Sequence, residues 1–551
     1  MKKEARVYAV MIIFLTLLFS SYGCAKEIDK EKLIADARQL ADILEKAHPD
    51  PYIRGGGKIV FHRRLQKTIL SIPEEGMSNL EFYRLLRPFV AAVNDPHTHL
   101  RSPYPHLAAL ARGLPLRFAI VEQSLYVTGV PKEECRDLLG ARLVAVEGVP
   151  FEEIKTRQQK LQGHDNEYDV LSTIGGYGAL WYWFYLEQLI PEWLDKNQIR
   201  LVLLHPDGQE RKHTLPTLKR VQFPLLGFKS EFDLPSREKC DFVYSFLDNE
   251  KRTALLLIDN MSTYKEAFEA WDSYGFPWTM DRAKQVFKRY QGKNPPKDKD
   301  ALFAGLPSVT ETFRSLVKDM KEAGTETLMI DLRRNQGGNS LMSQILVYYL
   351  YGKEELLGNR REKATEIRKL SEYFFKQYGK TILEELNEGS PVPLTREDYN
   401  LQHDREFQSE RSDEDVAKEM EEFLERGPTF AEEYRAGHYS GYYLPKNVLV
   451  LSSANTFSSG WTLMYRLYKA GAILVGTPSS QAGNCFGDTL QFQLDNSKLS
   501  GSVSHKYFDM FPDDPEMGRV LRMHHQMTYD KLKSYDFDPN AEILFALEVI
   551  E

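Results

Sequence analysis

Apolar residues recur every three or four positions through the first part of the chain after residue 24, a spacing typical of amphipathic helices. The pattern predicts a helix over residues 30–48, which ends where residues 48–51 read His-Pro-Asp-Pro. The same spacing predicts further helices over residues 61–70 and 80–93. We therefore expect residues 25–112 to form a helical N-terminal domain.

The pattern changes at Gly113, where short apolar segments bounded by glycine predict β-strands over residues 116–121 and 124–130. Residues 140–150 read Gly-Ala-Arg-Leu-Val-Ala-Val-Glu-Gly-Val-Pro, which predicts a strand, a turn and the start of a helix near Phe151. This run resembles a PDZ module, whose groove binds an extended peptide as an added strand. A generic β-hairpin is the alternative. We expect a PDZ-like module over residues 113–222, with further strands at 199–204 and 210–215 and an aromatic helical insertion at 179–190.

After Pro224 the apolar runs become continuous, as in strands that are buried on both faces of an α/β sheet. The predicted strands lie at residues 253–258, 327–332, 448–451 and 473–475, with helices at 309–323 and 341–350 between them. Residues 223–551 are therefore expected to form an α/β domain. Within it, residues from about 353 to 441 are highly charged and have helical spacing, which predicts a solvated helical insertion. The fold class is thus a multidomain α+β and α/β protein.

The first 24 residues have the features of a signal peptide. Basic residues precede an apolar run over residues 7–19, which is shorter than the ~20 residues needed to span a bilayer. Ser21-Tyr22-Gly23-Cys24 resembles a bacterial lipobox, in which the cysteine is lipidated and becomes the mature N-terminus. The alternative is an ordinary secretory signal with an incidental cysteine. Either reading predicts an exported protein, and the first adds a lipid anchor at Cys24 in the cell envelope.

The composition excludes several classes of protein. The 551 residues are 42% hydrophobic and 27% charged, which excludes a fibrous or wholly disordered chain. Lys and Arg number 71 against 79 Asp and Glu, so the chain offers no basic surface to nucleic acid. Four cysteines cannot build a disulfide framework, and no C-x-x-C spacing indicates a metal site. We expect no metal and no cofactor.

The first candidate for chemistry is the segment that follows the predicted strand at 448–451. It leads through Ser458 and Ser459 into a predicted helix that begins near Gly460. A serine at the first turn of a helix faces free backbone N–H groups, and the helix dipole favours the negative charge that develops in acyl transfer. The same serine could simply cap the helix, because serine is a preferred N-cap residue.

The second candidate is residues 331–338, Asp-Leu-Arg-Arg-Asn-Gln-Gly-Gly, where a predicted buried strand enters a glycine turn. Paired glycines allow backbone N–H groups to approach a reacting oxygen closely. Alone this motif is weak, because strand–Gly-Gly–helix turns are ordinary α/β connections.

Together, in this order, the two motifs resemble those of the serine peptidase family that contains tail-specific (C-terminal-processing) proteases, tricorn core proteases and interphotoreceptor retinoid-binding proteins. Residues 331–338 match the glycine motif of the family and residues 456–460 its nucleophile motif. Residues 48–52 (His-Pro-Asp-Pro-Tyr), residues 95–98 (Asp-Pro-His-Thr) and the C-terminal residues 538–547 extend the similarity. The resemblance implies a catalytic domain of the tail-specific protease (crotonase-like ClpP) type that cleaves peptides or proteins.

The resemblance also implies roles for single residues. Ser458 falls at the nucleophile, and the N–H groups of Ser459 and of Gly337 or Gly338 would form the oxyanion hole. The lysine base of tail-specific proteases is absent, because residues 476–487 contain no lysine. The tricorn-like branch uses a histidine before the PDZ module, a position that His97 occupies, and a late glutamate for which Glu516 is the nearest match.

Other hypotheses use the same residues. Because the family lysine is missing and Trp461 replaces a glutamate found in relatives, the chain could be an inactive peptide- or ligand-binding protein on the same fold. His97 and His99, with His524 and His525, could form a zinc site, although no accompanying carboxylate motif supports one. Cys485 could be a thiol nucleophile, or a small buried residue. The sequence leaves the oligomeric state and the cleavage specificity open.

Overall fold

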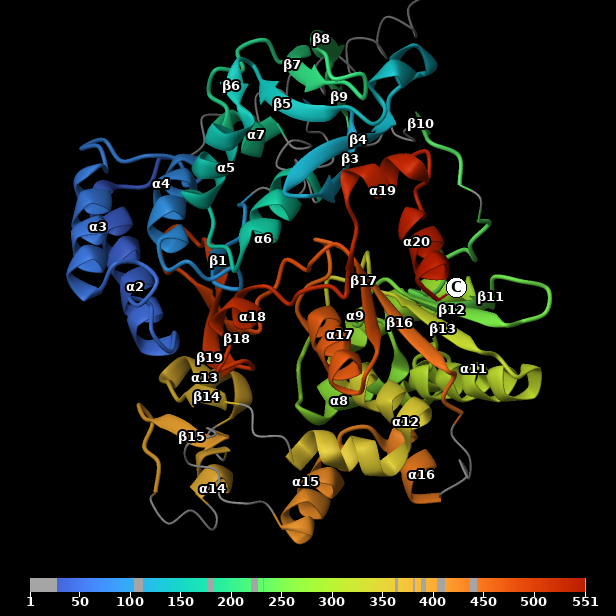
Figure 1. The fold of residues 1–551 in the computed structure, drawn as a ribbon. Coiled ribbons are helices and arrows are strands. Elements are labelled where there is room, and N and C mark those ends of the chain that lie inside the picture. The colour runs from blue at the N-terminus through green and yellow to red at the C-terminus, as the bar shows by residue number, and fades with distance from the viewer. Residues whose placement is uncertain are drawn as a thin grey trace, which may run out of the picture.

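The computed structural model describes residues 27–103, 112–176, 183–219, 226–230, 232–361, 365–379, 382–387, 393–403, 412–436 and 443–550. The predicted signal peptide and Cys24 lie outside these residues, as does part of the predicted aromatic helix. Figure 1 shows an N-terminal group of helices, a β-rich module and a larger sheet-based domain arranged around a common centre.

The N-terminal helices are α2 (Lys30–Ala47), α3 (Lys58–Leu70) and α4 (Asn79–Ala91). Each was predicted from the apolar spacing, and the structure confirms all three. The side chain of Ser78 accepts the N–H of Glu81, which forms a capping box at the start of α4. Their apolar faces form one core with strands from much later in the chain, since Leu40 and Phe82 share a cluster with Leu490.

The β-rich module is a seven-stranded sheet with its own core. Its central path runs β10-β4-β5-β7-β8, β3 pairs with β4, and β6 pairs with β5. The strands are β3 (Arg117–Val121), β4 (Ser124–Val130), β5 (Arg142–Val146), β6 (Val149–Pro150), β7 (Gln198–Leu204), β8 (Glu210–Pro216) and β10 (Leu226–Gly227), and the short pair β2 (Arg112–Gly113) and β9 (Leu218–Lys219) lies beside them. The helices are η2 (Glu133–Leu138), α5 (Phe151–Gln159), α6 (Glu167–Leu171), the π-helical turn η3 (Ser172–Gly176) and α7 (Trp183–Leu189).

The largest domain is built on a six-stranded sheet in the order β11-β12-β13-β16-β17-β20. The strands are β11 (Phe242–Phe246), β12 (Thr253–Ile258), β13 (Thr327–Asp331), β16 (Asn447–Ser452), β17 (Ile473–Gly476) and β20 (His525–Gln526), all parallel except for the pair β11–β12. Alternate residues point to opposite faces. Leu256, Ile330 and Val450 belong to one core, whereas Leu257 and Leu451 belong to another. Burial on both faces explains the continuous apolar runs.

Helices cover both faces of this sheet. One face packs against α8, α11, α12 and α17, and the other against α20 and the strands β3 and β4 of the β-rich module. The helices of the domain are α8 (Lys265–Ser273), α9 (Thr279–Gln291), α10 (Lys299–Ala304), α11 (Val309–Ala323), α12 (Leu341–Arg361, kinked at Gly352), α17 (Ser459–Lys469), α18 (Pro515–Arg519), α19 (Tyr529–Ser534) and α20 (Ala541–Ile550).

A second, five-stranded sheet joins the N-terminal helices to the large domain. Its path is β1-β19-β14-β15, and β18 pairs with β19. The strands are β1 (His99–Leu100), β14 (Thr365–Lys369), β15 (Tyr399–His403), β18 (Asn484–Gln493) and β19 (Ser500–Asp509). The charged insertion therefore contributes two strands as well as the helices α13 (Glu372–Tyr378), α14 (Ile382–Asn387), α15 (Asp413–Glu425) and α16 (Pro428–Ala436). Among the described residues, none of the helices has the length and apolar character needed to cross a membrane.

Candidate active site

The two motifs singled out in the sequence meet because β13 and β16 are neighbouring parallel strands, with Asp331 opposite Leu451. Ligand sites of open α/β sheets lie at this carboxyl edge of the strands. Side chains tie the two following loops together. Thr456 Oγ1 donates to Leu332 O at 2.9 Å, and Ser453 Oγ donates to Arg333 O at 2.6 Å.

Ser458 occupies the sharp turn between β16 and α17. Its backbone has φ 52° and ψ −126°, a strained conformation for a residue other than glycine, and its side chain does not cap the helix. Strain of this kind costs ~1–3 kcal/mol and is found mainly at functional sites. A nucleophile on a strand-to-helix turn has this geometry because the turn exposes its hydroxyl. The capping hypothesis for Ser458 is therefore wrong.

The glycine turn packs directly against Ser458. A Cβ on Gly337, which has φ 99°, would lie 2.6 Å from Ser458 Cβ and 2.7 Å from Ser459 N. Gly338, at φ 140°, has no room for a Cβ either, because one would lie 2.3 Å from Met261 O. Only glycine allows this approach.

Asn335, fully buried within the same motif, holds the turn in place. Its Nδ2 donates to Ile258 O at 3.0 Å and its Oδ1 accepts the N–H of Gly337 at 2.8 Å. The sequence left open whether Gly337 or Gly338 supplies an N–H to the oxyanion hole. Because the N–H of Gly337 is already bonded to Asn335, Gly338 is the better candidate. Within the described part of the chain, the N–H groups of Gly338 and Ser459 have no acceptor.

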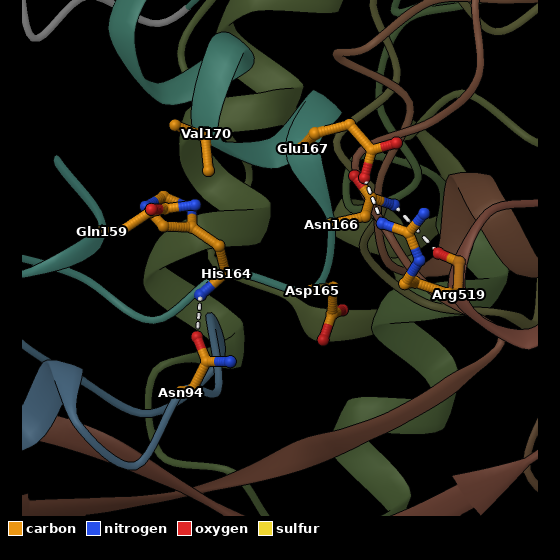
Figure 2. Close-up of a pocket in the computed structure, with 8 residues that line it drawn as sticks. All are labelled: Asn94, Gln159, His164, Asp165, Asn166, Glu167, Val170 and Arg519. Carbon is orange, nitrogen blue, oxygen red and sulfur yellow. Dashed lines mark hydrogen bonds and ion pairs between the residues drawn. The ribbon is translucent and has the colours of Figure 1, made fainter. Parts of the chain in front are cut away.

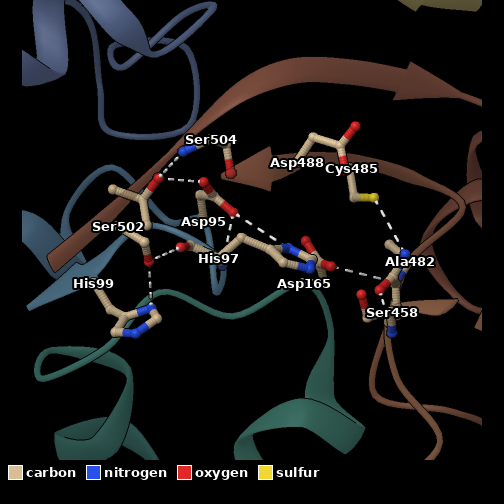
Figure 3. A network of polar contacts seen from close by, with 12 residues as sticks. Asp95, His97, His99, Asp165, Ser458, Ala482, Cys485, Asp488, Ser502 and Ser504 are labelled. Atoms are coloured by element: carbon tan, nitrogen blue, oxygen red, sulfur yellow. Dashed lines mark hydrogen bonds and ion pairs between the residues drawn. The ribbon is translucent and has the colours of Figure 1, made fainter. Parts of the chain in front are cut away.

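His97 lies beside the nucleophile turn. Its ring stacks on Phe457, the residue before Ser458, with centroids 4.8 Å apart, and its side chain is only 14% exposed. The sheet that contains β19 anchors the His97 loop, since Ser502 Oγ donates to His97 O at 2.8 Å and Ser504 N to Thr98 Oγ1 at 3.0 Å. Figure 3 draws His97 with its contact to Asp95, and Ser458 in the same view.

Two buried carboxylates flank His97. Asp95 Oδ1 accepts the backbone N–H of His97 at 2.9 Å and lies 3.8 Å from its Nδ1. Burial alone would raise the pKa of Asp95, but the contact with His48 and the charges of His48 and His97 outweigh it and hold this pKa below its usual range. Burial raises the pKa of Asp165 to about 6 against the opposing charges of Arg54 and His97. Both carboxyl groups are close enough to the imidazole for its charge to affect their pKa values.

Asp165 was not predicted from the sequence; it follows α5 in the run Gly163-His164-Asp165-Asn166. The run of polar residues after a helix is the only signal for it in the sequence. Glu516 was expected near His97, but its side chain is 70% exposed on α18 and lies 3.7 Å from Arg519. The carboxylates that the structure places around His97 are therefore Asp95 and Asp165.

The segment where relatives carry their lysine supplies Gln481. Its Oε1 accepts the N–H of Ser458 at 2.6 Å, and its Nε2 lies 3.7 Å from Cys485 Sγ. Trp461, which replaces a glutamate of relatives, is 2% exposed and stacks on Tyr465 in the core. Neither residue offers a base to Ser458.

The other chemical hypotheses find less support. Burial raises the pKa of the Cys485 thiol well above its ordinary value, so this thiol stays protonated and is a poor nucleophile. His99 belongs to the sheet of β19, whereas His525 belongs to that of β17. Among the described residues, no group of three or more His, Cys, Asp or Glu side chains could hold a metal ion.

A pocket of about 480 Å³ opens beside this network (Figure 2). Asn166, Glu167 and Arg519 contact one another on one side of the pocket, and Asn94 accepts the N–H of His164 on the other, with Asp165 also in the lining. Asp165 lines the pocket and is also close enough to His97 for their charges to interact.

Comparison with known proteins agrees with this fold. Residues 301–509 match the model of peptidase family S41, a span that contains the glycine turn and Ser458 but not His97. The structure of mature CPAF superposes with a TM-score of 0.51 at 13% identity, covering 92% of this chain and 95% of that chain. The structure of mature CPAF complexed with lactacystin superposes with a TM-score of 0.53 at 14% identity, covering 94% of this chain and 98% of that chain.

A C-terminal processing protease of the photosystem II D1 protein is less similar, with a TM-score of 0.38 at 12% identity over 92% of this chain and 95% of that chain. No curated protein sequence gives a significant match. At such low identities the likeness concerns the fold alone, and it confirms the expected multidomain α+β class.

Proposed function

We propose that the chain is a serine peptidase of the S41 type that cleaves peptide bonds through an acyl-enzyme on Ser458. The observation that carries the proposal is the strained turn at Ser458, packed against Gly337 beside the N–H groups of Ser459 and Gly338. Nucleophile and oxyanion donors are thereby adjacent, as acyl transfer requires.

His97 is the base of this mechanism. It takes the proton from Ser458 Oγ as the oxygen attacks the peptide carbonyl carbon, and the N–H groups of Ser459 and Gly338 stabilise the oxyanion. The imidazolium then gives its proton to the leaving amine, and water hydrolyses the acyl-enzyme. Asp95 and Asp165 stabilise the charge on His97 during these steps. Stacking of His97 on Phe457 supports this role.

Cleavage of an unfolded protein such as casein tests the proposal. We expect wild-type protein to produce fragments, and Ser458→Ala and His97→Asn to lose cleavage while unfolding at the wild-type temperature. Ser534→Ala changes an exposed serine on α19 and is the matched control. Equal cleavage by wild type and Ser458→Ala would refute the mechanism.

The second candidate is an inactive binding protein on the same fold. It is favoured by Gln481, which occupies the lysine segment and accepts the Ser458 N–H. A fluorophosphonate probe separates the two, because it labels only an activated serine. Absence of label on correctly folded wild-type protein would favour the binding protein.

We further propose that the chain is exported and anchored to the cell envelope by a lipid on Cys24. The proposal rests on the lipobox-like segment that ends at Cys24. Labelling of cells with a palmitate analogue should mark wild-type protein and spare Cys24→Ala. Equal label on both would contradict lipidation at this cysteine.

A further inference from the structure

The loop that joins α2 to α3 contacts the candidate active site, although it belongs to the N-terminal helices. It begins at His48, which follows α2 directly and is fully buried, and its sequence His-Pro-Asp-Pro ends that helix. The His48 ring packs 4.4 Å from the ring of Phe486 on β18. The loop therefore lies between the N-terminal helices and the second sheet.

The hydrogen bond to His48 indicates the tautomer of its neutral ring. The N–H of Asp50 donates to His48 Nδ1 at 3.1 Å, so Nδ1 is unprotonated. A neutral imidazole then carries its proton on Nε2. This nitrogen lies 3.3 Å from Asp95 Oδ2 in a fully buried contact. His48 Nε2 is thus in close, buried contact with the Asp95 carboxylate.

Asp95 connects His48 to His97. Its Oδ2 also accepts Thr98 Oγ1 at 2.5 Å, while its Oδ1 accepts the N–H of His97. The carboxylate is therefore held by the backbone and side chains of its own turn on one side and by His48 on the other. Without His48, one of its oxygens would lose a buried partner.

The far end of the same loop reaches the other carboxylate. Arg54 Nη1 donates to Asp165 Oδ1 at 3.1 Å and to Asn94 O at 3.1 Å. Arg54 Nη2 donates to Asn484 O at 2.9 Å. One short loop thus contacts both carboxylates that flank His97.

We propose that His48 is a positioning residue of the active site, which acts through Asp95 to orient the His97 imidazole and to set its affinity for a proton. The proposal rests on the proposed function, in which His97 is the base. Among the described residues, the titratable groups that interact with His97 include Asp95, Asp165 and His99, and those that interact with the two carboxylates include His48, Arg54, Asp169 and Cys485.

Two amide substitutions separate positioning from a merely structural role. An asparagine amide takes the place of Nδ1, so His48→Asn can still accept the N–H of Asp50 but does not reach Asp95. A glutamine amide takes the place of Nε2, so His48→Gln can still donate to Asp95. Ile53→Ala changes a side chain of the same loop that is 68% exposed and is the matched control.

The measurement is the rate of fluorophosphonate labelling at Ser458 from pH 5 to pH 9. We expect His48→Asn to label about 10-fold more slowly than wild type and with a shifted pH midpoint. This loss is smaller than the ~10²–10⁴-fold that a positioned base contributes, because His97 itself remains. His48→Gln should stay within about threefold of wild type, and Ile53→Ala should be unchanged. A wild-type rate and midpoint in His48→Asn would overturn the proposal.

A second measurement separates this proposal from the proposed function. If wild-type Ser458 takes no label, the function fails, and NMR titration of ¹³C-labelled histidines then decides the role of His48. His97→Asn assigns the His97 signal. A changed His97 titration in His48→Asn, restored in His48→Gln, supports positioning. An unchanged titration refutes it.

Discussion

Substitution of Gly337 by alanine probes the packing between the glycine turn and the nucleophile. The new methyl group would lie 2.6 Å from Ser458 Cβ and 2.7 Å from Ser459 N, which is closer than real Cβ contacts. Either Ser458 or the glycine turn must move. In both cases the distance between Ser458 Oγ and the oxyanion donors changes.

Two costs add in this variant. A residue with a side chain at φ 99° costs ~1–2 kcal/mol, and overpacking a close contact costs ~1–3 kcal/mol. We therefore expect Gly337→Ala to lower the free energy of unfolding by ~2–5 kcal/mol. Gly471→Ala is the matched control, because Gly471 has φ 92° and open space around its missing Cβ. Its cost should be only the ~1–2 kcal/mol of backbone strain.

Urea unfolding measures the stability of both variants, and fluorophosphonate labelling measures the reactivity of Ser458. Loss of one oxyanion donor costs ~10²–10³ in rate, and we expect Gly337→Ala to label more slowly by that factor. Gly471→Ala should label at the wild-type rate. The reasoning is refuted if Gly337→Ala labels normally and is no less stable than Gly471→Ala.

Two further predictions concern buried charges. Because the folded protein raises the pKa of Asp165 to about 6, it binds that proton more tightly than the unfolded chain. Stability should then fall by ~3 kcal/mol as the pH rises from about 4 through about 6, and Asp165→Asn should remove this slope in urea unfolding; parallel pH profiles would contradict it. Arg333, which is 11% exposed, pairs with Asp331 at 2.8 Å and Glu542 at 2.5 Å. Arg333→Met should cost ~3–5 kcal/mol of unfolding free energy, whereas Arg334→Met, at a site 64% exposed, should cost less than ~1 kcal/mol; equal costs would show that the buried pair adds nothing.

Much of the fold could be predicted because its strands and helices are strongly patterned. Strand β12 and helix α11 begin and end where the apolar pattern predicts. The strand is buried on both faces and the helix on one face, so each has a clear apolar pattern. Strand β14 was missed, because its sequence Thr-Glu-Ile-Arg-Lys has no apolar alternation and it is a strand through pairing with β19. Tertiary pairing of this kind leaves no local signal.

Some residues of the candidate site could likewise be predicted from the sequence and others could not. Ser458 and the two glycines stand in short motifs whose order along the chain is informative. Asp165 could not be found from sequence, because its contact with Arg54 depends on how the β-rich module packs on the N-terminal helices. Glu516 was chosen by position along the chain alone, and position does not predict which side chain is buried.

A crystal structure of the protein after reaction with a fluorophosphonate tests the central claim most directly. We predict a covalent bond to Ser458 Oγ, with the phosphonyl oxygen ~2.7–3.1 Å from the nitrogens of Ser459 and Gly338. A ring nitrogen of His97 should lie within ~2.6–3.2 Å of Ser458 Oγ. An adduct on another residue, or a phosphonyl oxygen turned away from both N–H groups, would contradict the account.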